Sequence, residues 1–351
     1  MSRDKLIILG VLVLGVLGFL VYEQSRKDAA IGQPSVVAKD FPSISAPDDI
    51  DKISLTNGDK GEVVLEKVAD ASGAAVGDGG AGGVWQLTKP VTAPANQQTV
   101  KDLVANLKDL KVDEPINLKL DDDVRKDKQL DAAHGLHLVA WKGSDKKVDE
   151  TFGKSGTAGQ LVVLTAKPDQ VWAAKGYSGY LYTKEAKDYR DKEILKFDDG
   201  VAAQVTISNS HGALSFTKSA ANGKWAGTMD NKPIANFSED KVKDMLRSCK
   251  GLTADDFADG KSLAETGLDK PEARLTVVLK DGAANYELLV GKTGSGTNRY
   301  VKRADDDVIY QLGSYSADWL TSDASKYVTP PDGGVGAAPD GGMKVSQRFK
   351  K

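Results

Sequence analysis

The chain has 351 residues, with 47 lysines and arginines against 50 aspartates and glutamates, which gives a formal charge of −3. This near-neutral balance argues against a nucleic-acid binder, since such proteins usually carry a strong basic excess. A single cysteine excludes an internal disulfide framework and any multi-thiolate metal cluster, and three histidines leave little for a histidine-rich metal site. At about 100–200 residues per domain, the length predicts about two domains.

The N-terminal segment from Leu6 to Tyr22 carries no charge and would span about 25 Å as a helix, near the lower limit for crossing a membrane. A cleaved signal peptide is the alternative, but its apolar stretch usually runs only about 7–15 residues before a small-residue cleavage site, and no convincing site follows Tyr22. We therefore expect an uncleaved anchor, residues 1–27, that contacts membrane lipid through residues 6–22.

The charges that flank this segment leave its orientation open. Arg3 and Lys5 precede it and Arg26 and Lys27 follow it, so the count of positive charges on the two sides is tied. A short N-terminal tail inside and a translocated large domain are the usual arrangement of a signal anchor. We therefore expect a single-pass protein of the inner (cytoplasmic) membrane, with the bulk of the chain extracytoplasmic.

The remainder of the chain repeats itself in sequence. Residues 137–177 align without gaps with residues 275–315, which places the FGKSG motif that starts at Phe152 opposite the VGKTG motif that starts at Val290. Shorter blocks earlier in the chain match in the same order, among them ISLTN at Ile53 and VTISN at Val205. Matches in a constant order indicate a duplication.

The limits of the repeats divide the chain into segments. We expect repeat module 1 at residues 51–197 and repeat module 2 at residues 198–328. A linker at residues 28–50 joins the anchor to module 1. Residues 329–351, with two PDGG sequences and a basic end, are expected to form a disordered tail.

Each module has the same expected order of elements. A hairpin turns at Asn57-Gly58 in the first copy, and a third strand holds Trp85. The next segment, residues 100–110, spaces its apolar residues as one face of a helix. An antiparallel meander and a short aromatic-led helix follow. The predicted fold class is therefore α+β: an N-terminal single transmembrane helix, followed by two homologous modules of mainly antiparallel strands around one amphipathic helix each.

The GKS and GKT turns at residues 153–155 and 291–293 resemble the end of a phosphate-binding loop. That loop also needs a glycine five residues before the GK, so that backbone N–H groups surround the phosphates. Val148 and Tyr286 occupy those positions, and both turns follow a strand inside a meander. A hairpin role is therefore favoured over nucleotide binding.

Other residues with reactive side chains are further functional candidates. His134 and His137 could share a metal ion, but no third ligand is evident. In the second copy Leu275 replaces His137, and Thr266 replaces His134 when the HGL and TGL turns are matched. Cys249 matches an apolar position of the helix, which predicts a buried small hydrophobic residue.

The acidic runs at residues 121–123 and 305–307 lack the alternating ligands, glycine and final glutamate of a calcium loop, so solvated turns are expected. A hydrolase with paired carboxylates is a third function class, but 50 acidic residues always supply such pairs. We therefore expect no catalytic, cofactor-binding or metal-binding residue, no cofactor and no enzymatic activity.

Aromatic residues are dense after residue 170. Trp172, Tyr180 and Tyr182 form a possible ligand or partner surface, suited to a carbohydrate or a peptide. Repeat-matched pairs such as Trp172 and Tyr310 are more simply explained as core residues. Exposure of the three side chains in one cleft would favour the surface.

These motifs occur in a fixed order: an anchor, an amphipathic VKDL helix, a GL turn, a GK[ST] hairpin and V-[WY] before YS. In this order the chain resembles the bacterial domain of unknown function 4340 family, and the resemblance covers nearly all of residues 51–328. Such proteins are often encoded beside ABC-type transport systems associated with gliding motility. The resemblance implies an accessory envelope protein, with integral-membrane ABC transporter subunits as partners, and supplies no catalytic residue. A cell-envelope glycan- or peptide-binding protein is the alternative function.

Overall fold

The computed structural model describes residues 41–58, 60–69, 83–112 and 115–329. The chain divides into two compact units; unit 1 ends at Asp191 and unit 2 begins at Lys192. The predicted anchor at residues 6–22 and the predicted tail beyond Thr329 lie outside the described residues. Within the described ranges, no helix is long and apolar enough to cross a membrane.

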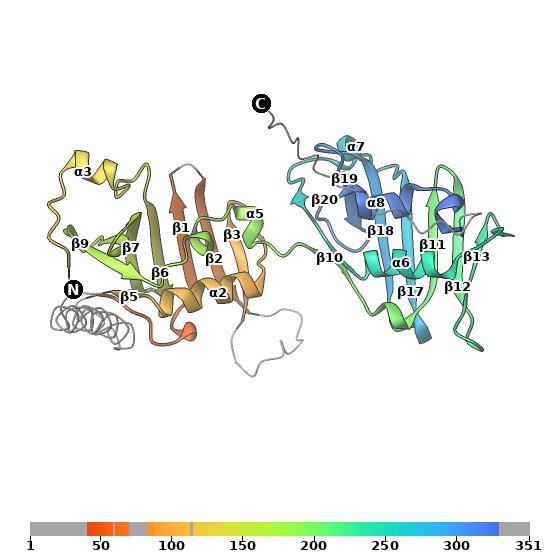
Figure 1. Cartoon of the computed structure of the whole chain (residues 1–351), viewed down its shortest axis with the longest axis horizontal. Helices are drawn as coiled ribbons and strands as arrows, with labels where there is room; N and C mark the ends of the chain where they lie inside the picture. The colour runs from red at the N-terminus through yellow and green to blue at the C-terminus, as the bar shows by residue number, and fades with distance from the viewer. Residues whose placement is uncertain (1–40, 59, 70–82, 113–114, 330–351) are drawn as a thin grey trace, which may run out of the picture. The chain divides into compact units, whose positions relative to one another are not determined.

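Unit 1 is built on one nine-stranded antiparallel sheet with the order β4-β3-β2-β1-β6-β7-β8-β9-β5. Its strands are β1 Lys52–Asn57, β2 Gly61–Val68, β3 Val84–Lys89, β4 Ala93–Pro94, β5 Lys111–Val112, β6 Leu136–Lys142, β7 Asp145–Gly156, β8 Gly159–Leu164 and β9 Lys167–Lys175. Its helices are η1 Pro47–Asp49, α2 Gln97–Lys108, α3 Asp122–Asp127, α4 Gly179–Tyr182 and α5 Ala186–Tyr189. The long helix α2 runs across the strands of the sheet (Figure 1).

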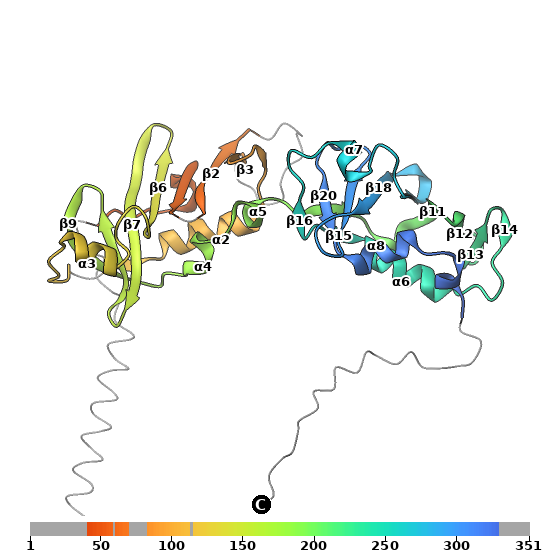
Figure 2. The same ribbon diagram turned by 90° about the horizontal axis from the view of Figure 1, so that it is seen from above.

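Unit 2 has a nine-stranded antiparallel sheet with the order β14-β13-β12-β11-β17-β18-β19-β20-β16, and a small sheet that pairs β10 with β15. Its strands are β10 Glu193–Lys196, β11 Ala202–Asn209, β12 Gly212–Lys218, β13 Trp225–Met229, β14 Lys232–Pro233, β15 Gly251–Thr253, β16 Asp256–Phe257, β17 Ala273–Leu279, β18 Asn285–Thr293, β19 Arg299–Arg303 and β20 Tyr310–Leu312. Its helices are η2 Asp199–Val201, α6 Glu239–Cys249, α7 Leu263–Thr266, η3 Lys280–Gly282, α8 Ser314–Thr321 and η4 Ala324–Tyr327. Figure 2 shows α6 and α8 on the same side of this sheet.

The two large sheets have the same strand order when their strands are matched in sequence. All their pairs are antiparallel, which confirms the mainly antiparallel α+β class for the described part of the chain. Strand β10, which sequence analysis grouped with module 1, pairs with β15 and so belongs to unit 2. Residues 41–50 of the predicted linker also belong to a folded unit, because Phe41, Ile44 and Ile50 are buried in the core of unit 1.

The main helix of each unit forms where its apolar spacing predicts it. In α2 the buried side chains are Val100, Leu103, Val104 and Leu107. Asn96 caps this helix, since its side chain accepts a hydrogen bond of 2.9 Å from the backbone N–H of Thr99. In α6 the equivalent buried face comprises Val242, Met245, Leu246 and Cys249. Ser238 is at the N-cap position of α6, without a side-chain capping bond.

The register of the sheets corrects the ungapped alignment in one strand. Leu138 lies opposite Glu150, and Leu275 lies opposite Leu288, so Leu275 corresponds to Leu138 and not to His137. The turn that follows is one residue longer in unit 2, at residues 278–285 against 141–147, and an ungapped alignment cannot accommodate that difference. A shift of one residue moves a side chain to the other face of a strand, so His137 lies on the outer face, where Arg274 is its counterpart.

A buried tyrosine closes each unit in the same way. The hydroxyl of Tyr189 donates to the carbonyl oxygen of Leu181 at 2.6 Å, and the hydroxyl of Tyr327 donates to that of Trp319 at 2.6 Å. Both pairs are buried, and each spans the same number of residues. The duplication therefore repeats individual hydrogen bonds as well as strand order.

We expect Tyr189→Phe and Tyr327→Phe each to lower the free energy of unfolding by about 1–2 kcal/mol, because the buried carbonyl loses its donor. Urea unfolding of the full chain, followed by tryptophan fluorescence, measures this change. Tyr180→Phe is the control, since the ring of Tyr180 is 67% exposed. Equal stabilities of the three variants would contradict a structural role for the two buried hydroxyls.

Candidate functional site

Unit 1 has an open pocket of about 610 Å³ at the ends of β7 and β8. Its apolar wall includes the buried side chains of Phe41, Val148 and Leu164. Lys146, Lys147 and Lys167 also line it. These six residues define what we call the lysine pocket. Its volume lies in the range of small-molecule sites, about 300–1,000 Å³.

Asp149 lies in the wall of the lysine pocket and accepts three polar contacts. The ammonium of Lys146 donates to it at 2.6 Å, the hydroxyl of Thr165 donates at 2.5 Å, and Nε2 of His137 lies 2.8 Å away. Burial opposes ionisation of Asp149, but these hydrogen bonds outweigh it and lower the pKa of the carboxyl group. The Thr165 hydroxyl points to a carboxylate and not to His137, so the group lacks the hydroxyl–imidazole contact of a nucleophilic triad.

The counterpart of this network in unit 2 supports a structural role for His137. Arg274 forms an ion pair with Glu287, and these residues occupy the positions of His137 and Asp149. The backbone N–H of Thr165 donates to the Asp149 carbonyl at 3.1 Å, and that of Ala304 donates to the Glu287 carbonyl at 3.0 Å. A basic–acidic pair therefore bridges the same two strands in both units. The hydroxyl of Thr165 has no equivalent in unit 2, where Ala304 takes its position.

Glu150, the residue after Asp149, points to the opposite face of β7 and has no exposed surface. It lies between Leu138 and Leu164 on the neighbouring strands. Neither carboxyl oxygen has a hydrogen-bond partner among the described residues. Burial, and then the charge of Asp149, raises the pKa of Glu150 to about 8. No sequence motif singles out Glu150, although it aligns with Leu288 in the repeat, and an acid aligned with an apolar residue is a signal that could have found it.

The three residues of the predicted ligand or partner surface do not come together on the surface. Trp172 and Tyr182 are each 1% exposed and belong to the core of unit 1. The ring of Tyr182 stacks on Tyr177, with centroids 4.9 Å apart, and its hydroxyl donates to Asn106 at 3.0 Å. Tyr180 alone is exposed, because the short helix α4 turns its ring away from the core. Residues two apart in a helix point to roughly opposite sides, so Tyr180 and Tyr182 separate although they are close in sequence.

The glycines of the GKS and GKT turns mark close approaches of two backbone segments. A Cβ atom on Gly153 would lie 2.4 Å from the carbonyl oxygen of Lys128, and one on Gly291 would lie 2.2 Å from that of Thr266. The crossing segments are equivalent, since Gln129 and Gly267 both adopt the left-handed conformation, with φ of 55° and 72°. The TGL turn therefore corresponds to residues 128–130, and not to the HGL sequence at His134 as the sequence comparison assumed.

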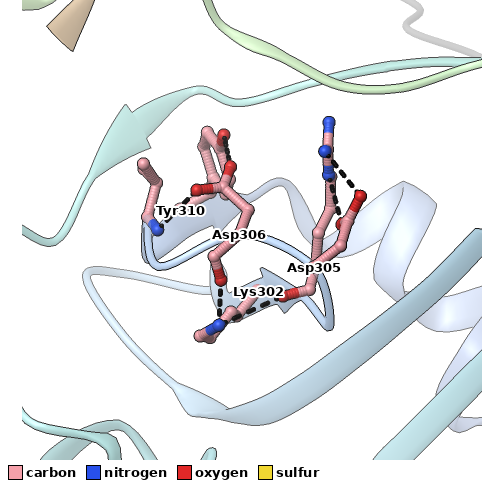
Figure 3. A network of polar contacts seen from close by, with 6 residues as sticks. Lys302, Asp305, Asp306 and Tyr310 are labelled. Carbon is pink, nitrogen blue, oxygen red and sulfur yellow. Dashed lines mark hydrogen bonds and ion pairs between the residues drawn. The ribbon is translucent and has the colours of Figure 1, made fainter.

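The second acidic run forms an internally bonded turn between β19 and β20 (Figure 3). Asp305 receives two hydrogen bonds of 2.9 Å from the guanidinium of Arg303. Asp306 accepts the hydroxyl of Tyr310 at 2.9 Å and the backbone N–H of Val308 at 3.0 Å. The carboxylates stabilise the turn and position Tyr310, which is the counterpart of Trp172.

The remaining candidates also have structural partners. Asp121 caps α3, accepting the Val124 backbone N–H at 2.9 Å, and His134 contacts Asp131 at 2.8 Å. Cys249 is buried beside Met245, and burial raises the pKa of its thiol to about 12. In the part of the chain that the structure describes, no three acidic, histidine or cysteine side chains gather as a metal site would require.

Comparison with known proteins places these features in a family. A family model described as a domain of unknown function (DUF4340) matches residues 85–271 and again residues 239–330. The two matches together extend over more than half of the chain, and they overlap as expected for a duplicated module. The chain belongs to this family. No curated protein and no solved structure matches it.

Proposed function

We propose that this DUF4340 protein is a non-enzymatic, membrane-anchored scaffold or accessory subunit of an ABC-type transport or gliding-type envelope system, with its bulk outside the cytoplasm. The observation that carries the proposal is the duplication: two units repeat one sheet order and the same buried tyrosine bond. Their outer surfaces have diverged, as the pairs His137–Asp149 and Arg274–Glu287 illustrate. Two similar frameworks with different surfaces suit a protein that holds partners together.

The state of the reactive side chains also supports a non-enzymatic role. Cys249 is buried as a thiol, and His137 and Asp149 form a cross-strand pair that unit 2 replaces by other residues. The alternative, a glycan or peptide binder, would have to rely on Tyr180 without Trp172 and Tyr182. The membrane-spanning segment at residues 6–22 and the ABC-type partners rest on the sequence and on the family resemblance.

Affinity purification of the tagged protein from native membranes in mild detergent tests the proposal. We expect stoichiometric recovery of ABC-type permease and ATPase subunits, identified by mass spectrometry. A chain that starts at residue 28, directed to the same compartment by a cleavable signal, is the control for association through the predicted anchor. An assembled and active transporter in membranes that lack this protein would refute the proposal.

A further inference from the structure

We propose that residues 41–44 form a strap that stays docked on unit 1 while Glu150 is protonated and is released when Glu150 loses its proton. Two residues of the strap, Phe41 and Ile44, are buried in the core. The inference goes beyond the accessory role and does not depend on it, because it concerns a movement within unit 1. Three features carry it: the apolar setting of Glu150, the place of Phe41 beside that setting, and the weak attachment of the strap backbone.

Glu150 lies in an apolar part of the core. Its side chain has no exposed surface, and neither carboxyl oxygen has a hydrogen-bond partner among the described residues. Asp149 and the stacked rings of Tyr177 and Tyr182 are in electrostatic contact with it. In the described part of unit 1, the side chains that α2, β6, β8, β9 and the strap bury in this core carry no ionisable group. The charged residues of the adjoining lysine pocket are Lys146, Lys147, Asp149 and Lys167. A carboxylate that forms in this core therefore needs water, because burial without a partner strongly opposes charge.

The strap covers the side of the core that Glu150 shares with the lysine pocket. Leu164 lies directly opposite Glu150 on β8, and Val148 is the preceding inward-facing residue of β7. Both of these neighbours line the lysine pocket, together with Phe41. Phe41 also packs edge-on against Trp172, with ring centroids 5.9 Å apart, and the indole N–H of Trp172 has no partner among the described residues. Displacement of Phe41 therefore opens a route from the pocket to buried polar groups that lack partners.

The backbone of the strap is weakly attached compared with its counterpart in unit 2. That counterpart is β10, which precedes β11 as the strap precedes β1, and it pairs with β15. The backbone N–H of Phe197, the next residue, also donates to the Lys250 carbonyl at 2.9 Å. Within the described ranges the strap forms no strand pair, and the N–H groups that follow it, of Ser45 and Ala46, donate to the nearby Asp49. Docking of the strap therefore depends on its two buried side chains.

Unit 2 has the same arrangement without the acid. Leu288 occupies the position of Glu150, and Tyr286 occupies that of Val148. The ring of Tyr286 packs against Phe197, with centroids 5.4 Å apart. Of the two units, only unit 1 therefore combines a buried acid, a small neighbour and an unpaired strap, and unit 2 supplies an internal control.

The direction of the effect follows from proton binding. While the strap is docked, burial and then the charge of Asp149 raise the pKa of Glu150 from 4.5 to about 8. Hydration in the released state returns the pKa toward 4.5, so only the docked state holds the proton between these two values. The ratio of released to docked chains should therefore rise by up to about tenfold per pH unit in this range and level off above about pH 8.

A nitroxide spin label at Ser43→Cys in the full chain, read by electron paramagnetic resonance between about pH 5 and pH 9, tests the proposal. Ser43 is exposed, and the native Cys249 is buried and so protected from the label. We expect a restricted spectrum at the lowest pH and a mobile component that grows as the pH rises. Glu150→Gln and Glu150→Leu should keep the restricted spectrum throughout, because neither side chain loses a proton.

The matched control carries the same label at Lys196→Cys, on β10 of unit 2, where the side chain is 75% exposed. Its spectrum should not change with pH, since Leu288 replaces the acid there. A mobile component that grows equally in the Glu150→Gln background, or that never grows with Glu150 present, would overturn the proposal. Loss of far-ultraviolet circular dichroism at the same pH would overturn it as well, because unit 1 would then unfold as a whole.

A second variant tests the part played by Phe41. Phe41→Ala removes the ring and leaves the acid, so it should favour release and move the rise of the mobile component to lower pH by about one unit or more. Combined with Glu150→Leu, the same change should give a mobility that does not vary with pH. A pH dependence that persists in this double variant would assign the titration to another group and overturn the proposal.

Discussion

Replacing Glu150 by leucine is expected to stabilise unit 1 by about 2–4 kcal/mol at pH 8. The carboxyl group is fully buried without a hydrogen-bond partner among the described residues, and Leu288 occupies the same position in unit 2. Folding raises its pKa from 4.5 to about 8, first through burial and then through the charge of Asp149. Leucine removes the unfavourable transfer of this group from water to the core.

The gain should depend on pH, because the folded and unfolded chains bind the Glu150 proton differently. Below about pH 4.5 both states hold the proton, and the contribution of this group is constant. Between that pH and about 8, only the folded state retains it. The free energy of unfolding therefore falls as the pH rises, by at most about 1.4 kcal/mol per pH unit, and this fall should be absent from Glu150→Leu.

Urea unfolding of the full chain between about pH 5 and pH 9 measures the effect. Wild type, Glu150→Leu and Glu150→Gln are compared, and Glu185→Leu, a change at an exposed carboxyl, is the control. The control should keep the wild-type pH profile. Parallel profiles for wild type and Glu150→Gln would mean that Glu150 is ionised and hydrated in the folded chain.

Replacing Gly291 by alanine is expected to destabilise unit 2 by about 3 kcal/mol or more, because a backbone carbonyl leaves no room for the new methyl group. The added Cβ would lie 2.2 Å from the Thr266 oxygen, and the side chain of Leu268 also approaches it. Either the strand or the crossing segment must move. Gly153 should behave in the same way in unit 1, since Lys128 crosses it at a similar distance.

Denaturant unfolding of the full chain, followed as two transitions, measures this loss. Gly251→Ala is the matched control, because a Cβ there meets nothing within 4 Å, and it should change stability by less than about 1 kcal/mol. Lys292→Ala should also leave stability unchanged, since its side chain is exposed. A stable Gly291→Ala variant would refute the interpretation that the GK motif marks a backbone crossing.

The elements with a strong local period could be predicted from sequence. The faces of α2 and α6 follow from the spacing of their apolar residues, and the burial of Cys249 follows from its place on that spacing. The turn at Asn57-Gly58 predicts the hairpin of β1 and β2. Each of these signals lies within a few neighbouring residues, so the spacing of apolar residues or the type of turn residue is enough to predict the local structure.

The placement of Trp172, Tyr180 and Tyr182 could not be predicted in the same way. All three are large aromatic residues within a short stretch, and only the docking of α4 on the sheet buries Tyr182 and exposes Tyr180. The burial of Phe41 in a predicted linker has the same origin. Aromatic side chains have similar local preferences whether they are buried or exposed, so composition alone does not distinguish the two.

The sequence by itself determined the duplication, the α+β class and the family of this chain. These properties depend on the order of motifs along the chain and on the spacing of its apolar residues. Only the tertiary structure decided which face of β7 each side chain occupies, and so placed Glu150 in the core and Asp149 beside the lysine pocket. It also decided that Gly153 and Gly291 lie beneath crossing segments. These outcomes depend on contacts between residues far apart in the chain, and one residue of register exchanges the two faces of a strand.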